Sequence, residues 1–225
     1  MDGRRGPARL AAGLIGLIAW GAVLAQLLLA LETGVEKGTP PWMVAWNLFS
    51  YFTILSNSLV GLVTLHYALA QSDPRSDWKA GREAHWLAGS GMLAATALYI
   101  IVVGIIYQTI LASQNNVTGF AKLVDTMLHG FVPIAYPLWW LAYGRSDRLR
   151  WWQALVWLEF PAIYCLYTLV RGDYLGRYPY PFIDVTKLGY ETVGMNIAGL
   201  VMLFLLGAGI VIGIDNLLPR RNASY

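Results

Sequence analysis

The residues best suited to chemistry in this sequence are Asp125 and His129, in the run LVDTMLHGFVPIAYPLWW. They are four positions apart, so on a helix they lie on one face. An imidazole beside a carboxylate has a fixed orientation and a stabilised charged form, as general acid–base chemistry requires. We expect Asp125 to orient His129; the alternative for Asp125, which lies about one turn nearer the surface, is that it holds only water or a loop. For His129 the structural alternative is a hydrogen bond to a neighbouring helix.

A second group of polar and small residues recurs at intervals of three or four, which is one face of a helix. Its members are Asn47, Ser50, Thr53, Asn57, Gly61 and Thr64. A packing seam between membrane helices is the structural alternative, because such seams are rich in these residues. The Thr53 hydroxyl is the candidate nucleophile. Asn57, Asn47 and Ser50 are candidates for supporting it or for holding an oxyanion.

The elements that must position these residues are membrane helices. Of the 225 residues, 57% are hydrophobic and only 13% are charged, whereas a soluble domain has about 25% charged residues. Apolar stretches of about 20 residues, enough to cross a bilayer, alternate with short polar segments. The sequence therefore predicts an all-α membrane protein, a six-transmembrane helix bundle forming a single domain over 1–225. The spans are expected at about 9–31, 43–69, 86–111, 122–143, 151–171 and 190–214.

The positive charges predict the orientation of this bundle. Eleven of the sixteen Lys and Arg lie at the two ends of the chain and in segments 70–85 and 144–150. The positive-inside rule then places both termini in the cytoplasm. Segments 43–69 and 122–143 both run inward from the outer face, which puts Thr53 and His129 at a similar depth of roughly 10–14 Å. At that depth the imidazole would take the Thr53 proton as its oxygen attacks an ester carbonyl.

Cationic residues gather in the Pro- and Tyr-rich segment 171–189, on the predicted outer side. Arg171, Arg177 and Lys187 are candidates for binding a substrate carboxylate, since Arg pairs with carboxylates bidentately. Contact with lipid headgroups is the alternative.

Further polar residues in the spans are expected to line a cavity: Glu159, Glu191, Asn196 and Tyr136. Glu159 precedes Pro161 closely, so capping of backbone groups freed by the proline is its structural alternative. Tyr107 is interpreted as an interface or packing residue. The single cysteine, Cys165, excludes an internal disulfide and a cysteine metal cage.

Three motifs in this order resemble the Pr6Pr membrane proteins, which are similar to the androgen-induced FAR-17a-type proteins of animals. They are YFTILSN at 51–57, D-x-x-x-H-x-x-x-P at 125–133 and RYPYPFIDV at 177–185. The resemblance covers nearly the whole chain and implies a multi-pass threonine hydrolase that cleaves fatty acid esters of hydroxy fatty acids. Thr53 matches the family's Tyr-x-Thr threonine and His129 its histidine. Where the animal proteins have Asn, this chain has Asp125.

The leading hypothesis is an intramembrane lipid hydrolase with Thr53 as nucleophile and His129 as general base. Its substrate would be a fatty acid ester entering from the bilayer, and its chemistry needs no metal or cofactor; no nucleic-acid partner is expected from a charge of +3. The expected localisation is the bacterial inner membrane, with the site in the outer-facing half. A proton-coupled transporter or channel using Asp125, Glu159, Glu191 and His129 is the main alternative. A haem or quinone protein and a purely structural role stay open, and the sequence predicts no oligomeric state.

Overall fold

The computed structural model describes residues 5–70, 87, 89–145 and 147–219. Within these ranges all regular secondary structure is helical, as the sequence predicts, and no strand is present. The elements in chain order are α1 (Arg5–Glu36), α2 (Pro41–Leu48), α3 (Phe52–Ala70), α4 (Ser90–Ile106), η2 (Tyr107–Leu111), η3 (Ala112–Gln114), α5 (Gly119–Thr126), η4 (Met127–Phe131), α6 (Val132–Trp139), η5 (Trp140–Gly144), α7 (Gln153–Val156), α8 (Glu159–Leu175), η6 (Pro181–Ile183) and α9 (Val185–Leu217).

Five helices are long and apolar enough to cross a membrane, which fits an integral multi-pass membrane protein. They cover Gly6–Glu36, Phe52–Leu69, Ser90–Gln114, Gln153–Leu175 and Val185–Leu217. The expected span 122–143 is not among them, although the backbone is helical from Gly119 to Gly144. This segment contains Asp125 and His129 and is interrupted by two π-helical turns, η4 and η5. Residues 86 and 88 of the expected span 86–111 and both ends of the expected domain 1–225 lie outside the described residues.

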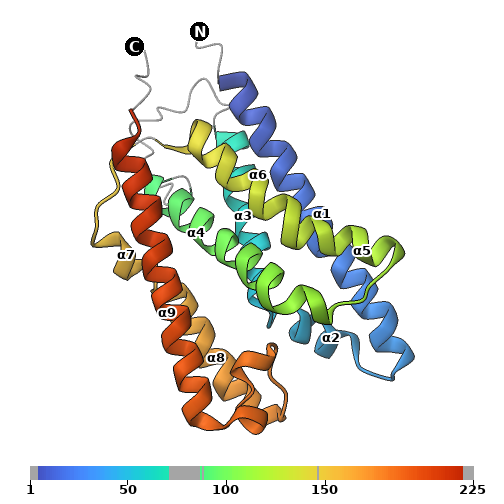
Figure 1. Ribbon diagram of the computed structural model, residues 1–225. Helices are drawn as coiled ribbons and strands as arrows, with labels where there is room; N and C mark the ends of the chain where they lie inside the picture. The colour runs from blue at the N-terminus through green and yellow to red at the C-terminus, as the bar shows by residue number, and fades with distance from the viewer. Residues whose placement is uncertain (1–4, 71–86, 88, 146, 220–225) are drawn as a thin grey trace.

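The long helices pack side by side, and α4 lies at their centre. Helix α1 runs along α3, while α4 packs against α3, α6 and α9 (Figure 1). The small residues Ala94, Ala95 and Ala97 of α4 are buried and let its neighbours approach closely. Leucines of α1 such as Leu10 and Leu28, in contrast, are about two-thirds exposed. A buried small-residue helix surrounded by helices with exposed apolar faces is the packing expected in lipid.

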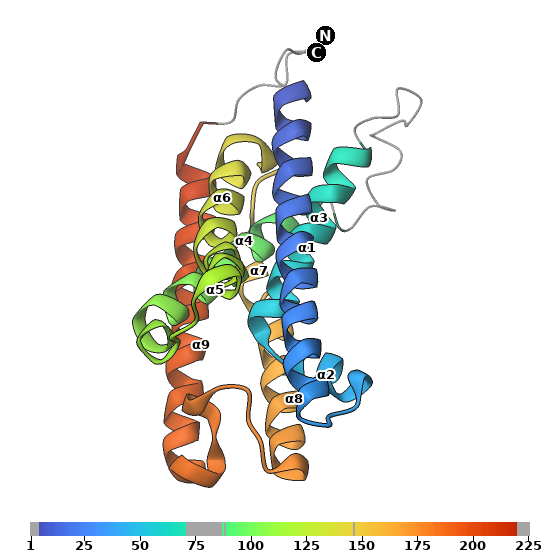
Figure 2. The ribbon, with the colours of Figure 1, turned by 90° about the vertical axis from the view of Figure 1, so that its right-hand side faces the viewer.

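The first helix begins and the last helix ends at the same end of the molecule. Figures 1 and 2 both show the start of α1 and the end of α9 at the end opposite to α2 and η6. Helix α9 continues farther than the expected span 190–214, because Asp184 caps it by accepting the backbone N–H of Thr186. Gly189, at φ 73°, bends its first turns.

The expected span 43–69 is not one continuous helix. Helix α2 ends at Leu48, the chain turns over Phe49–Tyr51, and α3 begins at Phe52. The expectation that Asn47 and Ser50 share one helical face with Thr53 was therefore wrong. The break moves Thr53 from the middle of an expected helix to the first turn of α3.

The expected span 151–171 corresponds to the candidate crossing Gln153–Leu175, in which the regular α-helix is interrupted at Trp157 and Leu158. Helix α7 ends at Val156, and α8 begins at Glu159. Glu159 thus lies in the first turn of a helix, where a negative charge is favourable beside the positive end of the helix dipole. Its carboxylate is exposed and not buried mid-span as expected.

Candidate functional site

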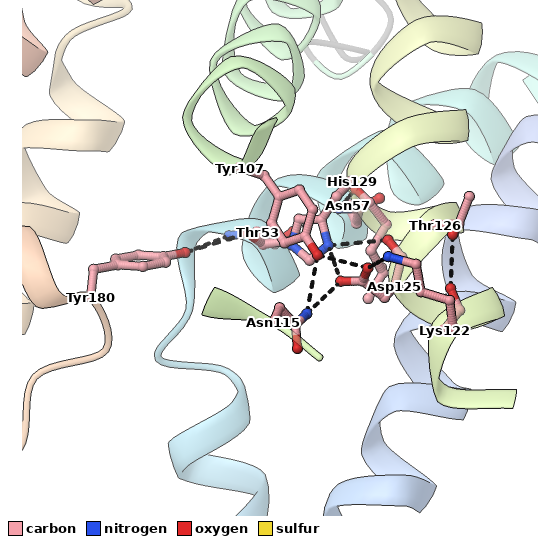
Figure 3. A network of polar contacts seen from close by, with 10 residues as sticks. Thr53, Asn57, Tyr107, Asn115, Lys122, Asp125, Thr126, His129 and Tyr180 are labelled. Carbon is pink, nitrogen blue, oxygen red and sulfur yellow. Dashed lines mark hydrogen bonds and ion pairs between the residues drawn. The ribbon is translucent and has the colours of Figure 1, made fainter. Parts of the chain in front are cut away.

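Thr53 is held at the amino-terminal end of α3 by a tyrosine from a distant part of the chain. As the second residue of α3, it has a backbone N–H without an acceptor inside the helix. That N–H donates to the Tyr180 hydroxyl at 3.2 Å (Figure 3). The Thr53 side chain, 7% exposed, lies with Oγ1 3.4 Å from the same hydroxyl. Since hydroxyls usually hydrogen-bond at about 2.7–2.8 Å, this second contact is loose and leaves Oγ1 free to turn.

A second tyrosine fastens the other side of the break. The Tyr164 hydroxyl donates to the backbone carbonyl of Ser50 at 2.9 Å. The Ser50 side chain donates to Trp46 O at 2.7 Å and contacts the Tyr167 hydroxyl at 2.8 Å. The backbone groups freed by the break are thus satisfied by side chains from α8 and the 176–184 segment. Ser50 itself is engaged away from Thr53.

Burial also keeps the Tyr180 hydroxyl protonated. It raises the pKa of the Tyr180 phenol above its ordinary value, because the phenolate would lose its hydration. The neutral hydroxyl accepts from the Thr53 N–H and retains a proton to donate. Tyr180 stacks on Phe182 at 5.2 Å and meets the Tyr51 ring edge-on at 5.6 Å. These rings fix where the hydroxyl points.

Asn57 links α3 to the turn that carries His129. Its Nδ2 donates to Thr53 O at 2.9 Å and to Leu128 O at 3.2 Å. The side chain is fully buried, and its Oδ1 has no hydrogen-bond partner in the described part of the chain. Both amide hydrogens are used, so Asn57 has none left for an oxyanion in this arrangement. Its contacts instead fix the distance between the Thr53 turn and the His129 turn.

Asp125 and His129 lie on one face, as their spacing predicted. The His129 ring nitrogen Nδ1 is 3.0 Å from Asp125 Oδ1 and 3.1 Å from the Asp125 carbonyl oxygen (Figure 3). Both neighbours are acceptors, so Nδ1 carries the proton. In the neutral ring Nε2 is then the acceptor, and among the described residues it has no hydrogen-bond partner. Asp125 thus selects the tautomer that can act as a base through Nε2.

Asp125 is the centre of a larger network. The residue is 6% exposed, and its carboxylate accepts from the Tyr107 hydroxyl at 2.7 Å, Asn115 Nδ2 at 3.0 Å and Lys122 Nζ at 3.1 Å, besides His129. Four donors fill the acceptor positions of an ionised carboxylate. A buried carboxylate with this many partners holds the side chains around it in place.

The Tyr107 and His129 rings stack with their centroids 3.7 Å apart and an interplanar angle of 11°. Both residues belong to π-helical turns, η2 and η4. A π turn inserts an extra residue into a helix, re-aims the side chains that follow, and is frequent at functional sites. The two turns bring the rings face to face, so the imidazole is confined by the Tyr107 ring on one side and by Asp125 at its edge.

Thr53 and His129 line one cavity of about 770 Å³, here called the polar cavity. It lies between the end of α1, α2, the start of α3, the two π turns and the 179–181 segment. Its polar lining includes Lys37, Asn47, Tyr107, Asn115, Asp125 and Tyr180. Thr53 and His129 do not hydrogen-bond to each other. The structure thus brings the two residues into the wall of one cavity but not into direct contact.

A second cavity of about 450 Å³, here called the apolar cavity, lies between α4, α8 and α9. Its lining is almost entirely apolar, with Val103 of α4, Cys165 of α8 and Leu200 of α9 as examples. Thr53 and Tyr180 line this cavity as well as the polar one. The candidate nucleophile therefore stands between a polar and an apolar chamber.

The three cations expected to bind a substrate carboxylate line neither cavity. The Arg171 guanidinium donates to Asn47 Oδ1 and lies 5.1 Å from the Trp46 ring centroid, so it ties α8 to α2. Arg177 is exposed. Lys187, 74% exposed, pairs with Asp184 at 3.2 Å. Lys37 is the cation that does line the polar cavity.

The four residues expected to line a cavity lie outside both. Glu159 and Glu191 are exposed. Asn196 donates to Phe182 O at 2.8 Å and so anchors the 176–184 segment on α9. Tyr136 is fully buried in the core, where its hydroxyl donates to Leu93 O at 3.0 Å. Their side chains thus stabilise the fold or face outward. The prediction failed because residue spacing shows neither the interruption between α7 and α8 nor the kink in α9.

Sequence reasoning missed Tyr180 and Asn115 and took Tyr107 for an interface residue. Tyr180 lies in the RYPYPFIDV motif, whose density of Pro and Tyr was the available signal. Tyr107 and Asn115 follow α4, where the chain forms a π turn and a 3₁₀ turn. No pattern of residue types in the sequence predicts these turns.

Among the described residues, no group of three or more His, Cys, Asp or Glu is placed to hold a metal ion. No family model, curated protein or solved structure matches this chain.

Proposed function

We propose that the protein is an intramembrane hydrolase of carboxylic esters of fatty acids, with Thr53 as nucleophile and His129 as general base. The observation that carries the proposal is that Thr53, at the start of a helix, and His129, oriented by Asp125, line one cavity. A hydroxyl nucleophile, a base and a group that orients the base are the parts that acyl transfer needs. The resemblance in sequence to the threonine hydrolases of the FAR-17a type supports the same assignment.

The reaction would proceed in two steps. Thr53 Oγ1 attacks the ester carbonyl carbon while His129 Nε2 takes the hydroxyl proton. The bond to the leaving alcohol breaks, and His129 returns the proton to the alcohol oxygen. Water then attacks the acyl-threonine and gives a proton to His129, which passes it to Thr53 as the fatty acid leaves. In this scheme ester and water become acid and alcohol, and His129 ends as it began.

Tyr180 and the start of α3 supply the stabilisation of negative charge that the reaction needs. The positive end of the α3 dipole lies at Thr53. The Tyr180 hydroxyl lies within 3.4 Å of both Thr53 N and Oγ1. A carbonyl attacked by Oγ1 would present its oxygen to the same hydroxyl, whose proton is free to donate. Tyr180 is therefore the proposed oxyanion donor in place of Asn57, Asn47 or Ser50.

Ester hydrolysis by purified variants tests this assignment. Thr53→Ala and His129→Ala should each abolish hydrolysis of long-chain acyl esters, and Thr53→Ser should retain part of it. Thr64→Ala is the matched control, because Thr64 is a buried threonine of the same helix that donates to Val60 O and lines neither cavity. Full activity in folded Thr53→Ala, or equal losses in Thr53→Ala and Thr64→Ala, would remove Thr53 from the mechanism.

We also propose a sixth membrane crossing by the Gly119–Gly144 segment, with both termini in the cytoplasm. At 1.5 Å per residue this helical segment is about 39 Å long, and it packs against α1 and α4. Its addition to five candidate spans gives an even number, which agrees with α1 starting and α9 ending at one end of the molecule. The positive-inside rule makes that end cytoplasmic and puts the polar cavity in the outer half of a bacterial inner membrane. Reporter fusions at both termini test this, and reporters on opposite sides would contradict it.

The transporter hypothesis has less support. Of its four ionisable residues, Glu159 and Glu191 are exposed and line neither cavity. Asp125 and His129 remain in the wall of the polar cavity, which Glu32 also lines. The Asp125 carboxylate, however, already accepts hydrogen bonds from four donors, which suits a structural centre better than a proton carrier.

A further inference from the structure

The position of Thr53 between two unlike cavities divides any ester bound there into two halves. Thr53 and Tyr180 are part of both walls, while His129 lines the polar cavity and not the apolar one. An ester whose carbonyl carbon lies at Thr53 must therefore extend one arm to each side.

The proton path decides which arm goes where. His129 must deliver a proton to the leaving alcohol oxygen, so the alcohol half has to lie on the side of His129. The polar cavity, with Lys37, Asn47 and Asn115 in its wall, suits an alcohol that carries polar groups. The acyl half is left on the other side of Thr53, where the lining is hydrocarbon.

We infer that the apolar cavity between α4, α8 and α9 is the acyl-chain site, which takes the fatty acyl half of the substrate. This inference rests on the proposed function and adds to it the binding direction of the ester and the helices that select the chain length. The rings of Phe52 and Phe204, 6.0 Å apart between centroids, are part of its wall. The cavity has a limited volume of about 450 Å³, so chain length should matter.

Occupancy of this site can be measured without hydrolysis. The probe is palmitic acid with a diazirine near its methyl end, photolysed with the purified protein in lipid nanodiscs. Adducts are expected on Cys165 or Leu200, and excess palmitic acid should suppress them. Adducts on Leu206, a lipid-facing residue of α9 that is 61% exposed and lines neither cavity, should resist competition. The same result is expected in Thr53→Ala, because binding does not need the nucleophile.

Chain-length selectivity gives the second measurement. Leu200→Trp fills the apolar cavity and should lower kcat/KM for palmitoyl relative to butyryl esters by about tenfold or more, since a single methylene in a shaped pocket is worth 10–200-fold. Leu206→Trp, the same substitution on the lipid-facing side of α9, should leave the ratio unchanged.

The outcomes separate this inference from the proposed function. Competable adducts at Cys165 or Leu200 together with full activity of Thr53→Ala would overturn the hydrolase mechanism and keep the acyl site. Thr53-dependent hydrolysis, with no competable adduct in the cavity and an unchanged ratio in Leu200→Trp, would overturn the acyl site and keep the hydrolase.

Discussion

Removal of one oxygen atom, in Tyr180→Phe, separates the support that Tyr180 gives to the fold from its part in the reaction. The substitution keeps the ring that stacks on Phe182 and removes the hydroxyl that accepts from Thr53 N at 3.2 Å. A buried N–H left without a partner costs about 1–3 kcal/mol. Loss of one oxyanion donor costs about 10²–10³ in kcat. We therefore expect a modest loss of stability and a large loss of kcat, with little change in KM.

Tyr136→Phe is the matched control for this substitution. Tyr136 is another buried tyrosine, whose hydroxyl donates to Leu93 O at 3.0 Å, and it lines neither cavity. Loss of its hydrogen bond should cost about 1 kcal/mol and leave kcat close to that of the wild type. Thermal unfolding in detergent gives the stabilities, and steady-state hydrolysis of an acyl ester gives kcat and KM. Equal losses of kcat in the two variants, following their stabilities, would refute a role for Tyr180 in the reaction.

Other substitutions test the network around the base and the start of α9. Asp125→Ala should lower kcat by about 10² or more, and Asp125→Asn by less, because its amide oxygen still accepts from the His129 ring; equal losses in the two would contradict this. Tyr107→Phe keeps the ring stacked on His129 and loses the bond to Asp125, so its kcat should lie between wild type and Asp125→Ala. The hydrogen bond from Thr186 holds the pKa of Asp184 below its ordinary value. The ionised Asp184 carboxylate therefore stabilises the fold above about pH 4, and this stabilisation is lost as the pH falls through the lowered pKa. Asp184→Ala should therefore lower the free energy of unfolding by about 1 kcal/mol at pH 7 and by progressively less below pH 4, as measured by thermal unfolding. A difference in stability between wild type and variant that does not change with pH would contradict the capping role of Asp184.

The sequence predicted the class of fold because hydropathy and charge are properties of long segments. Apolar runs identified the membrane helices, and the i, i+4 spacing identified the pairing of Asp125 with His129, since both follow from helical geometry alone. The breaks were not predictable in this way. The turn at Phe49–Tyr51 contains no Pro or Gly and depends on hydroxyls of Tyr164 and Tyr180, more than 100 residues away.

The same limit explains which site residues were predicted. Thr53 and His129 were chosen as candidates by residue type, by a similar expected depth and by the family resemblance. Arg171 was misjudged because its charge was visible in the sequence, whereas its partners Asn47 and Trp46, on α2, were not. Tyr180 was missed because its role comes from a tertiary contact with the start of α3. Residue spacing along one helix therefore predicts contacts within that helix, whereas contacts between different helices can be identified only from the structure.

Covalent labelling of the wild-type protein with a fluorophosphonate, followed by mass spectrometry of the modified peptide, tests most directly whether Thr53 is the nucleophile. We expect a single adduct on Thr53 that is absent from Thr53→Ala, strongly reduced in His129→Ala and retained in Thr64→Ala. An adduct elsewhere, or labelling of folded Thr53→Ala at the wild-type rate, would contradict the assignment of Thr53 as the nucleophile.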